Sequence, residues 1–330
     1  MNKLICVFLS VVIALTAVVF VSCSRTSDME AALKMGLGVY VPVPSATDAT
    51  EEKEGRGNVA ITAAVITVDA DGKVVACQLD TADNTVQYTD QGKAVAESGF
   101  KTKYEQGADY NMVAYGGASK EWFQQADAFE NFVVGKTLTE IKAAVAEDFT
   151  GNTDVIAAGC TIKINEFVGA IEEAFANLTD SSAMASSVLK LGMNTEQTIS
   201  DATEEKDGSN QVETTIFAAA VDADGKVLSA ASDCVQVKFT FNAAGTSTFD
   251  TTKAIFSKRE MGVNYGMVAY GGAAKEWFEQ ADAFNALCIG RTATEIVALC
   301  ATDHYGIDEV KAAGCTIMVN GLTKAAAKIG

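Results

Sequence analysis

The chain has 330 residues, a formal net charge of −18 and an apolar content of 48%. An acidic surface repels nucleic acid and anionic lipid, so this charge argues against a nucleic-acid-binding protein. The length corresponds to about two domains, and the apolar content is sufficient for well-packed cores.

The N-terminus has the composition of an export signal. Lys3 precedes an apolar stretch from Leu4 to Val21, and Phe20-Val21-Ser22-Cys23 resembles a lipobox. This order predicts a lipoprotein signal peptide over residues 1–22, lipidation of Cys23, and a lipid anchor on the extracytoplasmic face of the cell membrane. An ordinary signal peptide and an uncleaved anchor are the alternatives, because the stretch has about the 20 residues that a membrane span needs.

An internal duplication organises the rest of the chain. YNMVAYGGASKEWFQQADAFENFVVG at 110–135 and YGMVAYGGAAKEWFEQADAFNALCIG at 265–290 are identical at 18 of 26 positions. AAGCTI recurs at the same offset of 155, VDADGKV recurs at an offset of 153, and DATEEK also occurs twice. Such self-similarity predicts two tandem α+β repeats, at 33–178 and 189–330, after a tether at 23–32.

Strands are expected first in each repeat. Leu37 to Val43 forms a short strand that ends at the prolines, and Val59 to Val68 is a β-branched run. Ala70-Asp71-Gly72 then turns the chain into a strand from Val74 to Leu79, because Asp-Gly supplies the positive φ angles of a tight hairpin. Strand-like sequence continues over 85–89.

Helices follow the strands. One helix is expected to begin near Gly117 and end at Gly135, and its apolar stripe is expected to pack on the sheet rather than bind a cofactor; the stripe is Trp122, Ala126, Phe129 and Val133. Thr137 with Glu140, and Thr292 with Glu295, predict capping boxes of the next helix. A brief strand over 161–164 and a final helix capped by Asn165 complete the unit, which predicts a twisted, mainly antiparallel sheet with helices packed on it.

Histidine and cysteine limit the chemistry. The single histidine, His304, lies in a connecting segment, which argues against a histidine triad or metal site. No Cys-x-x-Cys spacing indicates zinc or iron–sulfur binding. Between the repeats, cysteines exchange with Val, Ala or Thr, which is typical of small core residues, so free thiols are expected. An oxidising location leaves disulfides open.

Three other motifs have simple structural interpretations. DADGK lacks the spacing of an EF-hand calcium loop. Tyr115-Gly116-Gly117 before a helix is compatible with phosphate binding, but a tight turn into the helix is the simpler interpretation. Acidic pairs such as Glu121 with Asp127, and Glu276 with Asp282, are six residues apart and are expected to be solvated surface groups, so a hydrolase or transferase is not favoured.

The end of each repeat resembles a known family. Residues 154–178, DVIAAGCTIKINEFVGAIEEAFANL, together with VDADGKV, resemble the FMN-binding domain of the C subunit of sodium-pumping NADH:quinone oxidoreductases and of many surface lipoproteins. The chain is also similar to duplicated lipoproteins of anaerobic Gram-positive bacteria, in which YxMxxxxxxxKEWxEQAxAF is recognisable. The second resemblance covers nearly all of both repeats, and the first covers the hairpin and the final segment.

The resemblance to the flavin family implies FMN as a cofactor. There, the Thr of Ser-Gly-Ala-Thr takes FMN through a phosphoester bond made by a separate transferase. An extracytoplasmic electron carrier with a redox partner protein is therefore implied. The matching positions are Thr161 and Thr316, preceded in the turn by Gly159 and Gly314.

The sequence also departs from that motif. Ala158 and Ala313 replace the serine, and Cys160 and Cys315 replace the alanine. The alternative hypothesis is a non-enzymatic surface module that has kept the fold, lost the flavin, and binds a small ligand or a partner protein.

Overall fold

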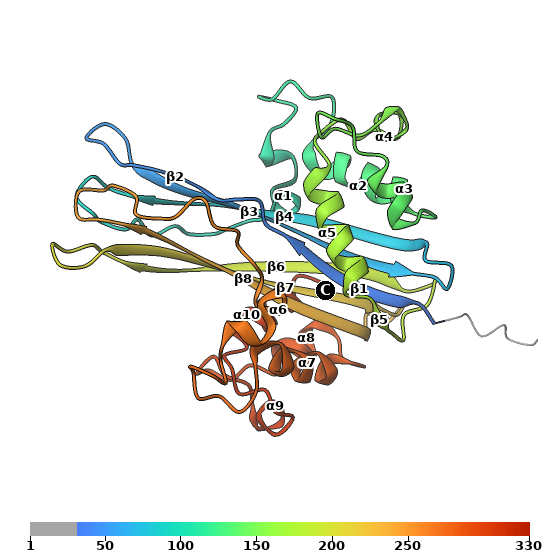
Figure 1. Cartoon of the computed structure of the whole chain (residues 1–330). Helices are drawn as coiled ribbons and strands as arrows, with labels where there is room; N and C mark the ends of the chain where they lie inside the picture. Colours follow the sequence, from blue (N-terminus) through green and yellow to red (C-terminus); the bar gives the residue numbers. More distant parts are fainter. Residues whose placement is uncertain (1–31) are drawn as a thin grey trace, which may run out of the picture. The chain divides into compact units, whose positions relative to one another are not determined.

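The computed structural model describes residues 32–330, which form one compact unit. The predicted signal peptide, Cys23 and the tether up to residue 31 lie outside the described residues. The fold is α+β with antiparallel sheets and helices, as the sequence predicts (Figure 1). The strands are β1 Lys34–Tyr40, β2 Ser45–Thr47, β3 Gly55–Val68, β4 Val74–Tyr88, β5 Thr179–Asp180, β6 Val188–Ser200, β7 Gly208–Val221 and β8 Val227–Phe241.

Helices follow the long hairpin in both the first half (residues 33–178) and the second half (residues 189–330), and their order is the same. In the first half they are α1 Lys103–Gln106, the 3-10 helix η1 Gly107–Tyr110, α2 Trp122–Val133, α3 Leu138–Lys142, α4 Thr153–Ala158 and α5 Asn165–Ala176. In the second half they are α6 Lys258–Met261, the 3-10 helix η2 Gly262–Tyr265, α7 Trp277–Cys288, α8 Ala293–Val297, α9 Asp308–Ala312 and α10 Asn320–Ala327.

Each half contributes one antiparallel sheet. In the first sheet β3 lies between β4 and the pair β1 and β2, and β5 adds two residues beside β1. The second sheet has the order β6-β7-β8, and β6 pairs with β7 along its whole length. Two short strands replace one long strand in the first half because Pro42 and Pro44 have no N–H group to donate.

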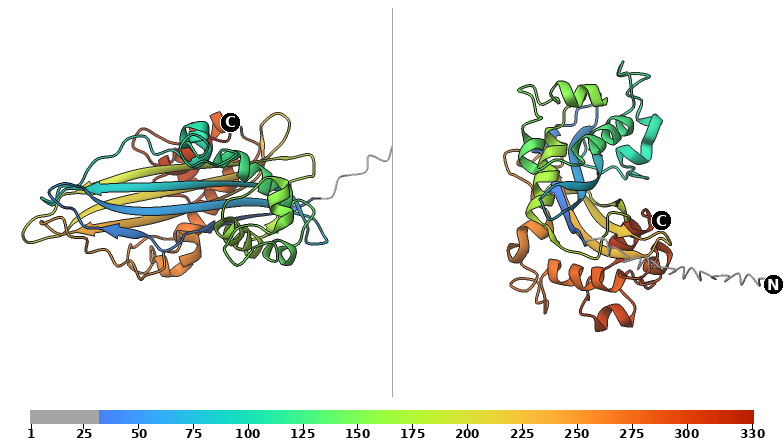
Figure 2. Two further views of the ribbon diagram at one scale, coloured as in Figure 1. Left: turned by 90° about the horizontal axis from the view of Figure 1, so that it is seen from above. Right: turned by 90° about the vertical axis from the view of Figure 1, so that its right-hand side faces the viewer.

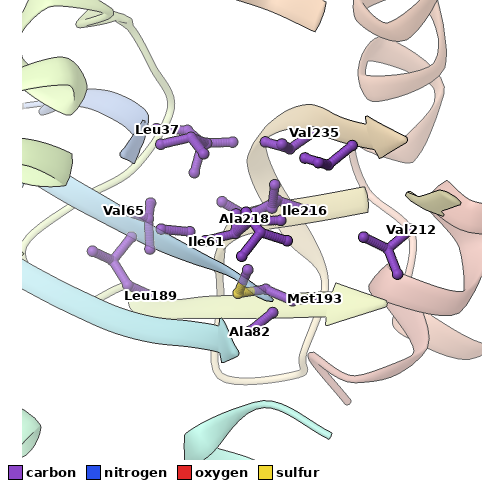
Figure 3. Close-up of a cluster of buried hydrophobic side chains, with 14 of the residues drawn as sticks. Leu37, Ile61, Val65, Ala82, Leu189, Met193, Val212, Ile216, Ala218 and Val235 are labelled. Atoms are coloured by element: carbon purple, nitrogen blue, oxygen red, sulfur yellow. The ribbon is translucent and has the colours of Figure 1, made fainter. Parts of the chain in front are cut away.

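The two sheets pack face to face around a shared core (Figure 3). Side chains alternate along β3, so that Ile61, Ala63 and Val65 enter this core while Ala64 and Ile66 face the helices. The second sheet contributes β6 and β7 side chains to the same core, including Leu189, Met193, Val212 and Ile216. Both predicted repeats therefore lie in one unit and share its largest core.

Helices cover the outer faces of both sheets (Figures 1 and 2). α2 and α5 contact the first sheet, and α7 and α10 contact the second. The apolar stripe of α2 is buried against the sheet, as the helical spacing predicts: Trp122, Ala126, Phe129 and Val133 are at most 4% exposed. Because both faces of the C-terminal halves of β3 and β7 are buried, these halves consist largely of apolar residues.

Most of the local signals are confirmed. Asp69 and Lys73 close the β3–β4 hairpin around Gly72, which has a φ of 75°. Both capping boxes, at Thr137 and Thr292, are present. Asn165, however, is the first residue of α5 and does not cap it; residues 161–164 form no strand, because only an isolated bridge joins Thr150 to Lys163.

Long hairpin arms extend from the sheets beyond the helices and connect the two halves reciprocally (Figure 1). The amide of Ala49 donates to Gly245 O, and the amide of Ala202 donates to Gly92 O, both at 2.8 Å. Tyr88 stacks on Phe241 with ring centroids 4.3 Å apart. These pairs stand at equivalent positions of the two repeats, so the arms of each half are fixed by the other half.

Asp48 and Asp201, the first residues of the two DATEEK segments, make the corresponding side-chain contacts between the arms. Asp48 accepts a hydrogen bond from the amide of Ser247 at 2.8 Å, and Asp201 accepts one from the amide of Ala94 at 3.0 Å. The duplicated motif therefore has a structural role, because each copy holds the hairpin arm of the opposite half.

A partly buried carboxyl group distinguishes the first half. Glu130 on α2 accepts a hydrogen bond from the amide of Leu79 at 2.6 Å. Burial, reinforced by the charges of Asp127 and Asp80, raises the pKa of Glu130 to about 8. The equivalent residue of the second half is the neutral Asn285, which accepts from the Ser232 hydroxyl at 2.9 Å. The first half thus carries an ionisable group where the second carries an amide.

Glu130 is expected to make stability fall as the pH rises. The pKa of Glu130 is higher in the folded chain than in the unfolded chain, so the folded state binds the proton more tightly. The free energy of unfolding therefore falls as the pH rises from the ordinary pKa of a glutamate to about 8, where this contribution is lost. The slope is at most about 1.4 kcal/mol per pH unit. Glu130→Gln should flatten the dependence between pH 5 and pH 8 in urea unfolding. Exposed Glu147→Gln is the control, and an equal effect of both variants would contradict the assignment.

Candidate ligand-binding site

Thr161 and Thr316 stand on exposed turns that follow short helices. α4 ends at Gly159, whose φ is 106°, and Gly314 after α9 has a φ of 98°. Cys160 and Cys315 then point into the core, while the next residue, Thr161 or Thr316, is exposed. The turn therefore places an exposed threonine directly after a buried thiol.

A buried glutamine holds each of these turns. Gln125 Oε1 accepts from the amide and the hydroxyl of Thr161, at 2.8 and 2.9 Å, while its Nε2 donates to Lys120 O. Gln280 makes the same three bonds, accepting from Thr316 at 2.8 and 3.0 Å and donating to Lys275 O. The KEWFxQ and AGCT motifs are therefore one structural element, because the Gln of the first binds the Thr of the second.

A lysine ammonium lies close to each turn. A Cβ atom on Gly159 would stand 2.2 Å from Lys120 Nζ, and one on Gly314 would stand 2.4 Å from Lys275 Nζ. Glycine is therefore favoured by the positive φ, whereas the flexible lysine side chain could move away from a Cβ atom. Burial raises the pKa of Cys160 to about 11, although the Lys120 charge acts in the opposite direction, so this residue is a neutral thiol at pH 7.

Glu121 and Glu276 are structural, which corrects the expectation that they are solvated surface groups. Glu276 is 5% exposed, and its carboxylate accepts from the amides of Met267 and Val268 at 2.9 and 3.2 Å. Glu121 binds the amides of Met112 and Val113 in the same way. Because Glu121 folds back on the preceding loop and caps the helix, α2 begins at Trp122 and not near Gly117.

The loop that this carboxylate anchors is exposed in both halves. It includes Tyr115 and Tyr270, whose side chains are 88% and 91% exposed. The Tyr115-Gly116-Gly117 segment is therefore a surface loop and does not begin a helix, so it offers no helix N-terminus to a phosphate.

A cleft of about 430 Å³ lies beside Thr316 in the second half. Three aromatic side chains, Tyr265, Trp277 and Tyr305, line it together with the side chains of Met267 and Met318. A second cavity of about 230 Å³ adjoins it and shares four lining residues with it. Those four are Glu213, Trp277, Ile317 and Met318.

An ion pair forms part of the cleft wall. Lys258 Nζ donates to Glu213 Oε1 at 2.9 Å and lies 5.2 and 5.7 Å from the ring centroids of Tyr265 and Trp277. Its side chain is only 6% exposed, whereas that of Glu213 is 38% exposed. Cys234 also donates its thiol proton to Glu213 Oε1, at 3.4 Å. A buried cation, two aromatic faces and a half-exposed carboxylate thus meet at one point.

The pKa values of this cluster follow from its geometry. Burial raises the pKa of Cys234 far above its ordinary value, so the thiol stays neutral. Burial alone would lower the pKa of Lys258, but its interactions with Cys234 and Glu213 outweigh burial and raise it. Because the thiol is neutral, the Glu213 carboxylate is the charge that keeps Lys258 protonated.

The corresponding region of the first half contains more polar side chains. Lys103 lies 5.1 and 5.9 Å from the rings of Tyr110 and Trp122, like Lys258, but its anionic partner is Asp83 at 3.5 Å. Glu166 stands at the position equivalent to Gly321, and accepts from the Thr62 hydroxyl at 3.4 Å.

The residues at the equivalent positions 166 and 321 explain why the two halves leave different amounts of space. A Cβ on Gly321 would lie 2.6 Å from Thr215 Oγ1, and Gly321 lines the smaller cavity. A glutamate side chain at the equivalent position of the first half takes up the corresponding space and bonds to Thr62. The two copies of the candidate site therefore differ in how much room they leave for a ligand.

The described part of the chain contains neither a membrane-spanning helix nor a cluster of metal ligands. Within residues 32–330, no helix has the length and apolar character needed to cross a bilayer. The same residues contain no cluster of three or more His, Cys, Asp or Glu side chains placed to hold a metal ion. The six cysteines of this range are free thiols.

Comparison of the chain with protein-family models, with curated proteins and with solved structures finds no match. The assignment of the site therefore depends on its geometry. Sequence reasoning found Thr316 and Gly314, but it missed Gln280, Lys258 and Glu213. The retention of KEWFxQ between the repeats was the available signal for Gln280, since it lies in the same block as Trp277.

Proposed function

We propose that this chain is a surface lipoprotein made of two copies of one α+β unit, and that the second copy binds a small planar ligand in the cleft beside Thr316. The observation that carries the proposal is the aromatic lining of this cleft, formed by Tyr265, Trp277 and Tyr305. Its volume of about 430 Å³ falls in the range typical of small-molecule sites. A lipid on Cys23 would hold the binding unit at the extracytoplasmic face of the membrane.

Binding is favoured over catalysis by the state of the polar groups around the cleft. Glu276 is buried and satisfies two backbone amides, and both ends of the Gln280 amide are engaged. Cys234 is a buried neutral thiol, and Lys258 is held by Glu213. These groups support the loops and walls, and none is arranged as an activated nucleophile with its base.

Filling the smaller cavity is expected to weaken binding in the adjoining cleft. The chain has only two tryptophans, so in a Trp122→Phe background the fluorescence of Trp277 reports directly on the cleft. A panel of riboflavin, nucleosides and indoles is titrated into this protein. Gly321→Glu, which copies the first half, should weaken any ligand by about tenfold or more, because the new side chain occupies the cavity shared with the cleft.

The reciprocal change provides a matched control. Glu166→Gly alters the same position of the first half and should leave the titration unchanged. Met318→Lys is a milder second variant, because Met318 is 50% exposed and Lys163 is its counterpart. Thermal unfolding shows that each variant is folded. If Gly321→Glu and Met318→Lys bind as the parent does, the ligand does not occupy this cleft.

Covalent FMN on Thr316 is the second candidate. One observation favours it: Thr316 is exposed, its turn is fixed by Gln280, and it lines an aromatic cleft into which a ring system can fold. In this version of the proposal the protein is an extracytoplasmic electron carrier, and FMN supplies the redox chemistry. The departures at Ala313 and Cys315 leave the hydroxyl in place, because Cys315 points into the core.

Co-expression with an FMN transferase tests this candidate. The expected result is a yellow protein whose intact mass increases by one FMN, with the increase lost in Thr316→Ala and retained in Thr161→Ala. A colourless protein of unmodified mass would exclude covalent flavin, while leaving noncovalent binding in the cleft to be judged by the fluorescence titrations.

A further inference from the structure

The polar groups that remain free inside the cleft define what a ligand must present. Glu213 Oε1 already accepts from Lys258 and Cys234, whereas within residues 32–330 no hydrogen bond or ion pair reaches Glu213 Oε2. Lys258 uses one of its three N–H bonds for Glu213 and directs its charge at two aromatic faces. The cleft therefore has one open carboxylate acceptor directly beside an ammonium donor.

Three other polar side chains of the cleft, Gln280, Thr316 and Tyr265, are engaged in hydrogen bonds within the protein. The Gln280 amide bonds to Lys275 and Thr316 through both of its ends. The Tyr265 hydroxyl donates to Gln236 at 3.5 Å. The Glu213 and Lys258 pair thus places a hydrogen-bond acceptor directly beside a donor, and the aromatic side chains around it favour a flat ring.

A cationic ligand does not suit this site. Its natural place would be against the faces of Tyr265 and Trp277, and the Lys258 ammonium already occupies the position near those rings. A simple anion would encounter the Glu213 carboxylate, which is the more exposed member of the pair. A neutral ligand with an adjacent donor and acceptor matches both groups at once.

We propose, building on the cleft assignment above, that the ligand is a planar heterocycle with a lactam edge, whose N–H donates to Glu213 Oε2 and whose neighbouring C=O accepts from Lys258. Uracil, guanine, pterin and isoalloxazine rings present this edge. Indole does not present it, although it has a similar flat face. Glu213 and Lys258 therefore form hydrogen bonds with the edge of the ring, and the aromatic residues contact its faces.

Methylated analogues test the role of the lactam N–H. Binding of guanosine and riboflavin is compared with that of 1-methylguanosine and 3-methylriboflavin by Trp277 fluorescence in the Trp122→Phe protein. Methylation should weaken binding by at least about tenfold, because the Glu213 acceptor is then left without its donor.

Variants of the pair extend the test. Glu213→Gln should remove the discrimination between parent and methylated rings, and thermal unfolding checks that it is folded. Asp83→Asn, which alters the equivalent ion pair of the first half, should leave affinity and discrimination unchanged. If Glu213→Gln does not fold, the methylated analogues alone decide the question in the unaltered protein.

The outcomes separate this inference from the cleft assignment. Equal affinity for methylated and unmethylated rings overturns the lactam inference, as does a panel in which only indole binds, and both results leave the cleft assignment intact. If no planar compound changes Trp277 fluorescence or thermal stability, the cleft assignment fails, and the inference fails with it.

Discussion

Replacement of Gly38 by alanine is expected to lower the free energy of unfolding by about 3 kcal/mol. A Cβ on Gly38 in β1 would stand 2.0 Å from Ala170 O and 2.2 Å from Ala174 N. Both are backbone atoms of α5, so no side-chain rotation relieves the clash and the helix must move away from the strand. Urea unfolding followed by circular dichroism measures the loss.

A second glycine serves as the control for backbone effects. Gly99 has a φ of 76°, and a Cβ there would meet no atom within 4 Å. Gly99→Ala therefore carries only the left-handed backbone penalty of about 1 kcal/mol. If Gly38→Ala costs no more than Gly99→Ala, close packing of α5 on β1 is not what requires glycine at position 38.

Truncation of Phe241, which lies between the hairpin arms, is expected to lower the free energy of unfolding by a similarly large amount. Phe241 is fully buried and stacks on Tyr88 with an interplanar angle of 7°. Phe241→Ala should cost about 3–5 kcal/mol, because it leaves a cavity between two arms that have few other buried side chains. Equilibrium unfolding provides the measurement.

Hydrogen exchange shows which part of the chain the Phe241→Ala substitution destabilises. The amides of Ala49 and Ala202, which bond across the arms, should exchange faster in Phe241→Ala, while amides in the central part of β7 should be less affected. Phe256→Ala is the matched control, since Phe256 is 49% exposed and should change stability by less than about 0.5 kcal/mol. A loss below about 1 kcal/mol in Phe241→Ala would show that the arms are held mainly by their backbone bonds.

Local sequence determined most of the secondary structure. The β-branched runs around the Asp-Gly turn predicted β3 and β4, and the spacing of Trp122 and Phe129 predicted α2. The start of α2 was predicted five residues too early, because Glu121 bonds to Met112 and Val113 and holds the preceding loop out of the helix. The capping Glu was visible in the sequence, but the residues it would bind were not.

The candidate site was only partly accessible from the sequence. Retention of KEWFxQ and AGCT between the copies marked both segments, but their connection is a hydrogen bond between residues 36 positions apart, Gln280 and Thr316. Glu213 and Lys258 come from β7 and α6, and nothing in their local sequence indicates that they meet. Such contacts depend on how the helices dock on the sheet.

The sequence by itself predicted two copies of one unit, the hairpin followed by helices in each copy, and the capping boxes at Thr137 and Thr292, because these features depend on neighbours a few residues away. The tertiary structure decided that the two sheets share a core and that the second copy has an open cleft. Whether a cleft is open depends on single residues, such as Glu166 or Gly321. Their size changes the cavity volume only where segments distant in the sequence pack together.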